Sequence, residues 1–118
     1  MTKEERIRKE RNRIKKVLGK LSKEKQELAA GLMDLAAFQR IELEDMRKDI
    51  AENGYTEKFS QSNSMQPYDR ERPISKMFMM LQGKYKETIT ALCSMMPKSE
   101  VKAAETDLME EYIRMRSD

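Results

Sequence analysis

The sequence predicts an all-α, oligomeric protein in which a long amphipathic central helix packs with a second core helix, a basic N-terminal helix and a short C-terminal helix. Three observations lead to this prediction. Apolar residues recur at steps of three and four over most of the 118 residues, which is the period of an amphipathic helix. β-Branched residues are few and scattered, so no strand pattern is convincing. Charged residues make up 38% of the chain, a proportion common in helical assemblies.

The longest element is predicted over Gln26–Asn53, where the apolar stripe is continuous. Asn53 and Gly54 form a helix stop, because both residues tolerate the left-handed conformation that ends helices. A helix of this length cannot bury its stripe against itself, so it needs the rest of the chain or other copies of it. Small residues that would let another backbone come close are Ala29, Ala30, Gly31, Ala36 and Ala37.

The second core helix is predicted to open at Arg72-Pro73, because proline suits the first turn, and to end near Met95, because Pro97 cannot continue it. The apolar faces of the two long helices are either an internal core or a surface for self-association, and both interpretations stay open. Gln39 within the stripe favours self-association, since a polar residue at an interface can set its register. The residues expected at an interface between copies are Leu28, Leu32, Leu35, Gln39, Leu43, Met46, Ile50, Met77, Phe78, Leu81 and Tyr85.

Residues 1–25 are predicted to form a basic helical arm that begins with a capping box at Thr2 and Glu5. A bend or break is predicted near Gly19–Ser22, because Gly19 is a poor helix residue and Ser22 can cap a new helix. Apolar residues spaced by seven also allow a coiled coil that continues into the central helix.

The arm carries eleven Lys or Arg and four Glu, a net charge of +7, whereas the remaining residues carry a net charge of −4. A basic arm on a mildly acidic body suits contact with nucleic-acid phosphates. A solvated face that keeps the protein soluble and contact with an anionic membrane surface are the alternatives. The expected phosphate-contacting residues are Lys3, Arg6, Arg8, Lys9, Arg11, Arg13, Lys15, Lys16 and Lys20.

Three segments follow from this organisation: the arm 1–25, a helical oligomerisation core 26–98 that contains a polar loop at 54–71, and a C-terminal helix within 99–118. The loop loses the helical period and is rich in Ser, Asn and Pro. Ser99 caps the last helix, whose apolar face runs from Val101 to Met115.

The composition predicts no catalytic residues, no metal site and no cofactor. The chain has no histidine, which removes the commonest general base and metal ligand, and no glycine-rich phosphate loop. The single cysteine, Cys93, excludes an internal disulfide and suggests a reducing cytosol. No apolar run approaches the length of a membrane span, and the charges from Lys3 onward are unlike a secretory signal.

Residues 33–98 resemble the small subunit of tailed-phage terminases. The likeness runs through LAAFQRIELEDMRKDIAENG, a polar loop with MQPY, and a helix that starts ERPISKMFMMLQGKYKETITALCSMMPKS. One branch of the family shares this order of an Ala-rich helix ending in Gly, a loop containing Pro, and a helix with a Pro-Ser-type stop. Cys93-Ser94-Met95 stands where that family typically has Leu-Gly-Leu.

This resemblance implies a non-catalytic protein of a bacterial host's cytoplasm that forms a ring-like homo-oligomer and binds the packaging site on double-stranded viral DNA. It also implies recruitment and regulation of the large terminase subunit. By position, the segment Lys3–Lys25 would contact DNA. The candidate docking residues for the large subunit are Leu108, Tyr112 and Met115.

Two other classes of protein share parts of this pattern. A small bacterial DNA-binding regulator would have the same basic arm and the same self-association. A structural helical oligomer that binds only protein would keep its oligomer without the arm.

Overall fold

The computed structural model describes the backbone of residues 1–117 and the side chains of residues 1–110. In this part of the chain the helices are α1 (Lys3–Val17), α2 (Lys23–Asn53), α3 (Pro73–Cys93) and α4 (Lys98–Ser117), and the strands are β1 (Thr56–Phe59) and β2 (Tyr68–Glu71). The chain is therefore mainly helical, as the sequence predicts, but it is not purely so.

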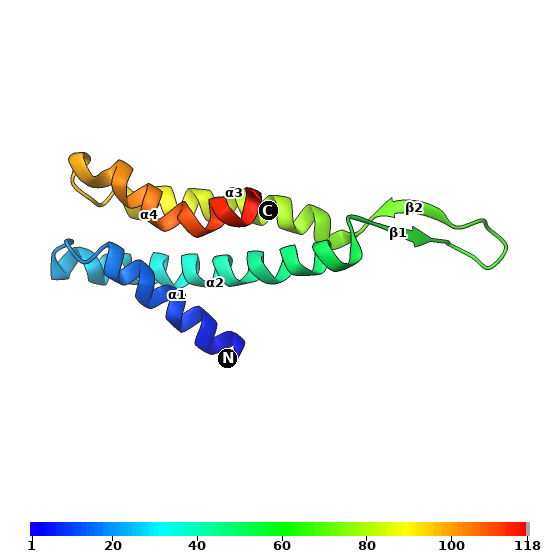
Figure 1. Cartoon of the computed structure of the whole chain (residues 1–118), viewed down its shortest axis with the longest axis horizontal. Helices are drawn as coiled ribbons and strands as arrows, with labels where there is room; N and C mark the ends of the chain where they lie inside the picture. Colours follow the sequence, from blue (N-terminus) through cyan, green and yellow to red (C-terminus); the bar gives the residue numbers. More distant parts are fainter. Residues whose placement is uncertain (118) are drawn as a thin grey trace.

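The helices lie side by side in an elongated molecule. α2 and α3 run in opposite directions, α1 folds back along α2, and α4 folds back along α3 (Figure 1). The molecule measures 64 × 28 × 24 Å. Its length follows from α2, whose 31 residues span about 46 Å at 1.5 Å per residue.

The predicted break between the arm and the central helix is confirmed. α1 ends at Val17, and the Gly19 and Leu21 amides donate to the Lys16 and Leu18 carbonyls at 3.2 and 3.1 Å, which closes a tight turn. The Ser22 hydroxyl then accepts the Lys25 amide at 3.2 Å and caps α2. The basic arm is thus a separate helix that reverses direction.

The predicted stop at the end of the central helix is also confirmed. Gly54 has a φ of 81°, and its amide donates to the Ile50 carbonyl at 2.7 Å. This backbone conformation favours glycine, because an L side chain there would be strained. α3 begins with Pro73 in its first turn, as predicted, and ends at Cys93, slightly before the predicted end.

The expectation of a strandless loop over 54–71 is wrong. β1 and β2 pair antiparallel, with Thr56 opposite Glu71 and Phe59 opposite Tyr68, and the hairpin projects beyond the helices (Figure 1). The stabilising contacts lie across the strands: the Phe59 and Tyr68 rings meet edge to face at 5.9 Å, and the Arg70 guanidinium lies 3.6 Å from the Phe59 ring centroid. These contacts form only when the two strands pair in this register, so the strand propensity of the sequence did not predict the hairpin.

The base of the hairpin is fixed to the helix ends by hydrogen bonds. Arg72 donates to the Gly54 carbonyl at 2.7 Å and to the Asp49 carboxylate at 2.8 Å. The side-chain amide of Asn53 donates to the same carboxylate at 2.7 Å. The hydrogen bonds from Asn53 and Arg72 lower the pKa of Asp49, and the one from Asn53 has the larger effect. Ser75 Oγ donates to the Tyr55 carbonyl at 2.8 Å.

The predicted stripe of the two long helices divides between the core and the surface. Leu28, Leu35 and Met77 are exposed, at 77, 44 and 54% of their surface. Gln39 is buried, and its Oε1 has no hydrogen-bond partner among the described residues. Partly buried members of the stripe are Leu32, Met46 and Leu81.

Four residues expected between copies lie instead inside the chain's own core, where they are not available to a second copy. Helix packing within one chain covers them, because α1 packs against α2 and α4 packs against α3 in addition to the contact between α2 and α3. They are Leu43, Ile50, Phe78 and Tyr85.

The C-terminal helix also packs into the core. Ala104 is 5% and Leu108 is 0% exposed. The expectation that Leu108 is a docking residue is therefore wrong, because the apolar face of α4 packs against the chain's own helices. The side chains of Tyr112 and Met115, the other two expected docking residues, lie outside the described residues.

We expect Leu43→Ala to lower the free energy of unfolding by about 2–5 kcal/mol, because Leu43 is fully buried and its truncation leaves a cavity. Met79→Ala is the matched control: Met79 is 67% exposed and its truncation should change stability by less than about 0.5 kcal/mol. Urea unfolding followed by circular dichroism measures both. Equal effects would contradict the assignment of Leu43 to the core.

We expect Cys93 to resist thiol reagents in the folded protein. Burial, with a smaller effect of Glu105, raises the pKa of the Cys93 thiol from 9.0 to about 11. At pH 8 its labelling should be at least about 100-fold slower than in urea, since each pKa unit is tenfold in thiolate. Because its pKa is higher in the folded state, the Cys93 thiol makes a contribution to stability that is fully present below pH 9 and is lost as the pH rises towards 11. Labelling at equal rates with and without urea would contradict burial.

Candidate nucleic-acid interface on helix α1

α1 forms where the sequence predicts a basic arm, and its apolar stripe attaches it to the body. The Thr2 hydroxyl accepts the Glu5 amide at 3.1 Å and caps the helix. Ile14 and Leu18 are fully buried, and Ile7 and Val17 pack against the same core. The stripe is thin, so polar contacts supply much of the remaining attachment.

Three of the expected phosphate-contacting residues instead pair with acids of α2. Lys3 pairs with Glu42 and Asp45, Arg6 donates to Asp45 at 2.8 Å and to Glu44 at 3.1 Å, and Arg11 pairs with Asp34. The hydrogen bond that Lys3 donates to Glu42 raises the pKa of Lys3, and the hydrogen bonds that Arg6 donates to Asp45 and, with a smaller effect, to Glu44 raise the pKa of Arg6. These cations therefore hold α1 on α2.

Two more of the expected residues face other parts of the chain. Arg13 pairs with the buried carboxylate of Glu10 and donates to the Asp107 and Leu108 carbonyls of α4, both at 3.1 Å. Lys20 Nζ lies 3.2 Å from a carboxylate oxygen of Glu100. α1 is thus tied to α4 as well as to α2.

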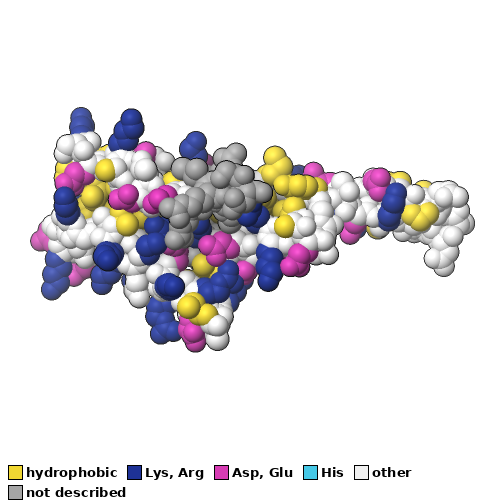
Figure 2. Space-filling model, viewed as in Figure 1, with side chains coloured by type: hydrophobic (Ala, Val, Ile, Leu, Met, Phe, Trp, Pro, Cys, Tyr) yellow, Lys and Arg dark blue, Asp and Glu magenta, His cyan; other side chains and the backbone are white. Residues whose placement is uncertain are grey.

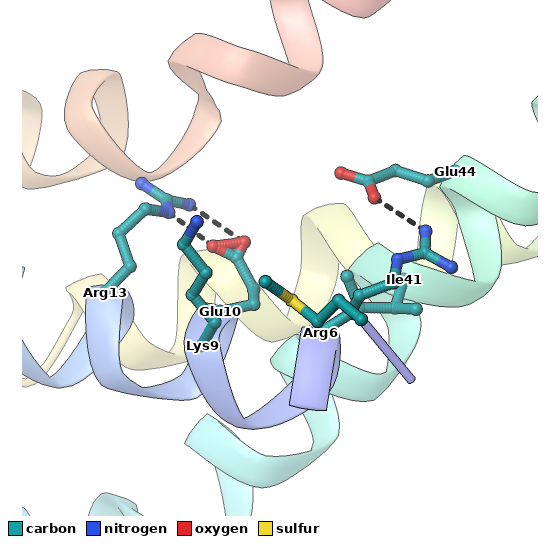
Figure 3. Close-up of a pocket in the computed structure, with 7 residues that line it drawn as sticks. Arg6, Lys9, Glu10, Arg13, Ile41 and Glu44 are labelled. Atoms are coloured by element: carbon teal, nitrogen blue, oxygen red, sulfur yellow. Dashed lines mark hydrogen bonds and ion pairs between the residues drawn. The ribbon is translucent and has the colours of Figure 1, made fainter. Parts of the chain in front are cut away.

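A cavity of about 270 Å³ lies beside these contacts. Figure 3 shows charged side chains from α1 around it, with Arg13 directed at Glu10 and Arg6 directed at Glu44. Arg6 and Arg13 pair with carboxylates in its wall, whereas Lys9 does not. Its lining is Met1, Arg6, Lys9, Glu10, Arg13, Ile41 and Glu44.

Sequence reasoning missed the buried arginine of α2. Arg40 is only 2% exposed, and its Nε donates to Glu44 at 3.2 Å. Glu44 therefore contacts one guanidinium from its own helix and one from α1. Tyr85 lies beside Arg40, and burial raises the pKa of its hydroxyl. The i,i+4 spacing of Arg40 and Glu44 was the one signal in the sequence.

The other four expected residues remain exposed on the outer side of α1. Arg8, Lys9, Lys15 and Lys16 make no ion pair or hydrogen bond with any described residue. Positions seven and eight apart share a helix face, so these four cations form one strip, the outer basic strip. Lys and Arg side chains are prominent over α1 in Figure 2, with acidic side chains among them.

Metal sites and membrane spans can be compared with the described residues. They contain no group of three or more His, Cys, Asp or Glu side chains placed to hold a metal ion. In the same part of the chain, no helix combines the length and apolar character required to cross a membrane. What α1 itself presents to solvent is charge on a helix surface.

Comparison of the chain with protein-family models, with curated proteins and with solved structures found no match. The functional interpretation of α1 therefore depends on its own residues and their arrangement.

We expect Glu44→Ala to loosen α1 and to lower the free energy of unfolding by about 1–3 kcal/mol, because hydrogen bonds to charged groups contribute this much. The variant removes the carboxylate that Arg6 and Arg40 both contact. Hydrogen exchange of the α1 amides and urea unfolding measure the effect. Glu4→Ala, an exposed position on α1, is the control. Unchanged exchange in α1 would contradict the role of Glu44 in docking it.

Proposed function

We propose that the protein is a non-catalytic, double-stranded-DNA-binding small terminase subunit that recruits and regulates a large subunit in genome packaging. The observation that carries DNA binding is the outer basic strip, Arg8, Lys9, Lys15 and Lys16, which makes no ion pair with the other described residues. The resemblance over residues 33–98 supports the packaging context. Homo-oligomers, with a ring as the expected form, complete the proposal.

The strip suits phosphate contact rather than base reading. Its residues span eight positions, or about 12 Å along the helix, which is enough for a few neighbouring phosphates of one strand. Lys and Arg at phosphates position a protein on the duplex without reading its sequence. Specificity would then come from DNA shape or wrapping. Copies in an oligomer would multiply these weak contacts into avidity.

Recruitment of the large subunit would require a docking surface that does not use Leu108. Leu108 is buried in the chain's own core, so a docking surface on α4 would have to use other side chains. Co-purification with a large terminase subunit separates this proposal from a bacterial DNA-binding regulator, which would share the strip and the oligomer.

One observation favours the second candidate, a structural helical oligomer that binds only protein. Five of the nine expected phosphate-contacting residues are engaged inside the chain, so the basic composition of the arm partly serves to hold the fold together. The strip would then be a solvated face. DNA binding separates the two candidates.

We expect the protein to bind double-stranded DNA with a steep salt dependence that weakens when Arg8, Lys9, Lys15 and Lys16 are all changed to Ala. Each neutralised phosphate contributes about −0.9 to the slope of log K against log salt, so four cations give at most about −3.6 per chain. Fluorescence anisotropy with a labelled duplex at several salt concentrations measures the slope.

The control changes four exposed lysines outside α1, Lys48, Lys86, Lys98 and Lys102, to Ala and lowers the net charge by the same amount. It should keep most of the slope, because its lysines lie outside the strip. Equal losses in both variants would show that net charge, not the strip, drives binding. No binding by the unaltered chain would leave the protein-only oligomer as the function.

A further inference from the structure

One face of the α2–α3 pair carries apolar side chains that no described element covers. On α2 the residues are Leu28 and Leu35, which are 77 and 44% exposed. On α3 the corresponding exposed residue is Met77, at 54% of its surface. Partly buried apolar neighbours continue this surface towards the groove between the two helices, namely Leu32, Met46, Leu81 and Met95.

Each helix of the pair presents a row of residues spaced by seven, which keeps the row on one side of the helix. The α2 seam is Leu28, Leu35, Glu42 and Asp49, and the α3 seam is Met77, Lys84 and Ala91. The α2 seam is therefore apolar and acidic, whereas the α3 seam is apolar and basic.

The two seams lie at matching levels. Arg40 of α2 lies beside Tyr85 of α3, and Lys25 Nζ donates to the Met95 carbonyl at 3.4 Å. Because the helices are antiparallel, this register sets Glu42 level with Lys84 and Leu35 level with Ala91.

We propose that a second copy of the chain packs on this face, with α2 of each copy across α3 of the other, about a two-fold axis parallel to the helices. The hairpins of both copies then project from the same end. The proposal concerns the self-association part of the proposed function, with a two-fold dimer in place of the expected ring, and does not depend on DNA binding.

Charge selects this arrangement over its alternative. Across the axis, Glu42 of each copy faces Lys84 of the other and Leu35 faces Ala91. Within one chain Glu42 contacts Lys3, and Lys84 Nζ lies 3.5 Å from a carboxylate oxygen of Glu87, so each would share its charge with the contact across the axis. The reversed arrangement, α2 over α2, would instead bring two acidic rows together, which is unfavourable.

The face is large enough for a stable dimer. From Leu28 to Asp49 the seam runs about 32 Å, and two neighbouring helices are about 20 Å wide, so each copy would bury roughly 640 Å². The total of about 1,300 Å² falls within the size of specific protein interfaces.

Gln39 lies beside this face but is covered by its own chain. The residue is 94% buried, yet its Oε1 lacks a hydrogen-bond donor among the described residues. It lies one turn from Leu35 and Leu43, on the side of α2 nearer the proposed axis.

The test is disulfide cross-linking between chains that carry Leu35→Cys and chains that carry Ala91→Cys, mixed and oxidised mildly. The arrangement predicts a cross-linked dimer in the mixture and none from either variant alone. A chain with both substitutions should give a doubly linked dimer and no larger species. The native Cys93 is fully buried, and the unaltered chain controls for its reactivity.

Each other outcome overturns the arrangement. Cross-linking of Leu35→Cys with itself would show α2 over α2, and a ladder of trimers and larger species would show a head-to-tail assembly. A monomer by light scattering would exclude self-association through this face. DNA binding by that monomer would leave the outer basic strip intact, so the two proposals fail separately.

A charge reversal tests the polar contact without depending on cross-linking. Lys84→Glu should weaken dimerisation at least about tenfold, because it sets two carboxylates against each other twice in the dimer. Lys86→Glu makes the same change of charge at an exposed position outside the α3 seam and should leave dimerisation unchanged. Equal effects of the two substitutions on the dissociation constant would contradict the contact with Glu42.

Discussion

The close approach of α2 to its neighbours is the constraint on which the rest of the structure depends. Ala29, Ala36 and Ala37 are fully buried, and small side chains let helix axes come near the short end of the usual 8–10 Å range. Tyr85 and Leu92 of α3 are also fully buried and belong to the same core. The pairing that results exposes one face of α2 and α3 and leaves the opposite side for α1 and α4.

Electrostatics then decides what the basic arm can do. A net charge of +7 over residues 1–25 overstates what solvent meets, because Asp34, Glu44 and Asp45 of α2 neutralise part of it in place. Such partly exposed pairs contribute little individually, but they fix which side of α1 turns outward. Acids of the body and cations of the arm thus pair within the chain. The remaining positive charge of the arm lies on the outer basic strip.

The sequence predicted most of the helical structure, because helix periods and stops are local. Ser22 and Gly54 marked helix ends correctly since each acts on its own backbone. Contacts between distant residues were beyond its reach. The Phe59–Tyr68 pair needs a strand register, and the same apolar period describes Leu43, which is buried, and Leu28, which is exposed. Periodicity says that a face is apolar, not which neighbour covers it.

The residues that fix the hairpin lie outside its strands. Arg72 joins the end of α2 to the start of α3 through Gly54 and Asp49, and the Arg72 amide donates to the Tyr55 carbonyl at 2.8 Å. The helix ends are therefore held together by groups that the hairpin does not supply. We therefore expect the segment between them to tolerate changes of length and sequence while the helical body, its register and its exposed faces stay the same.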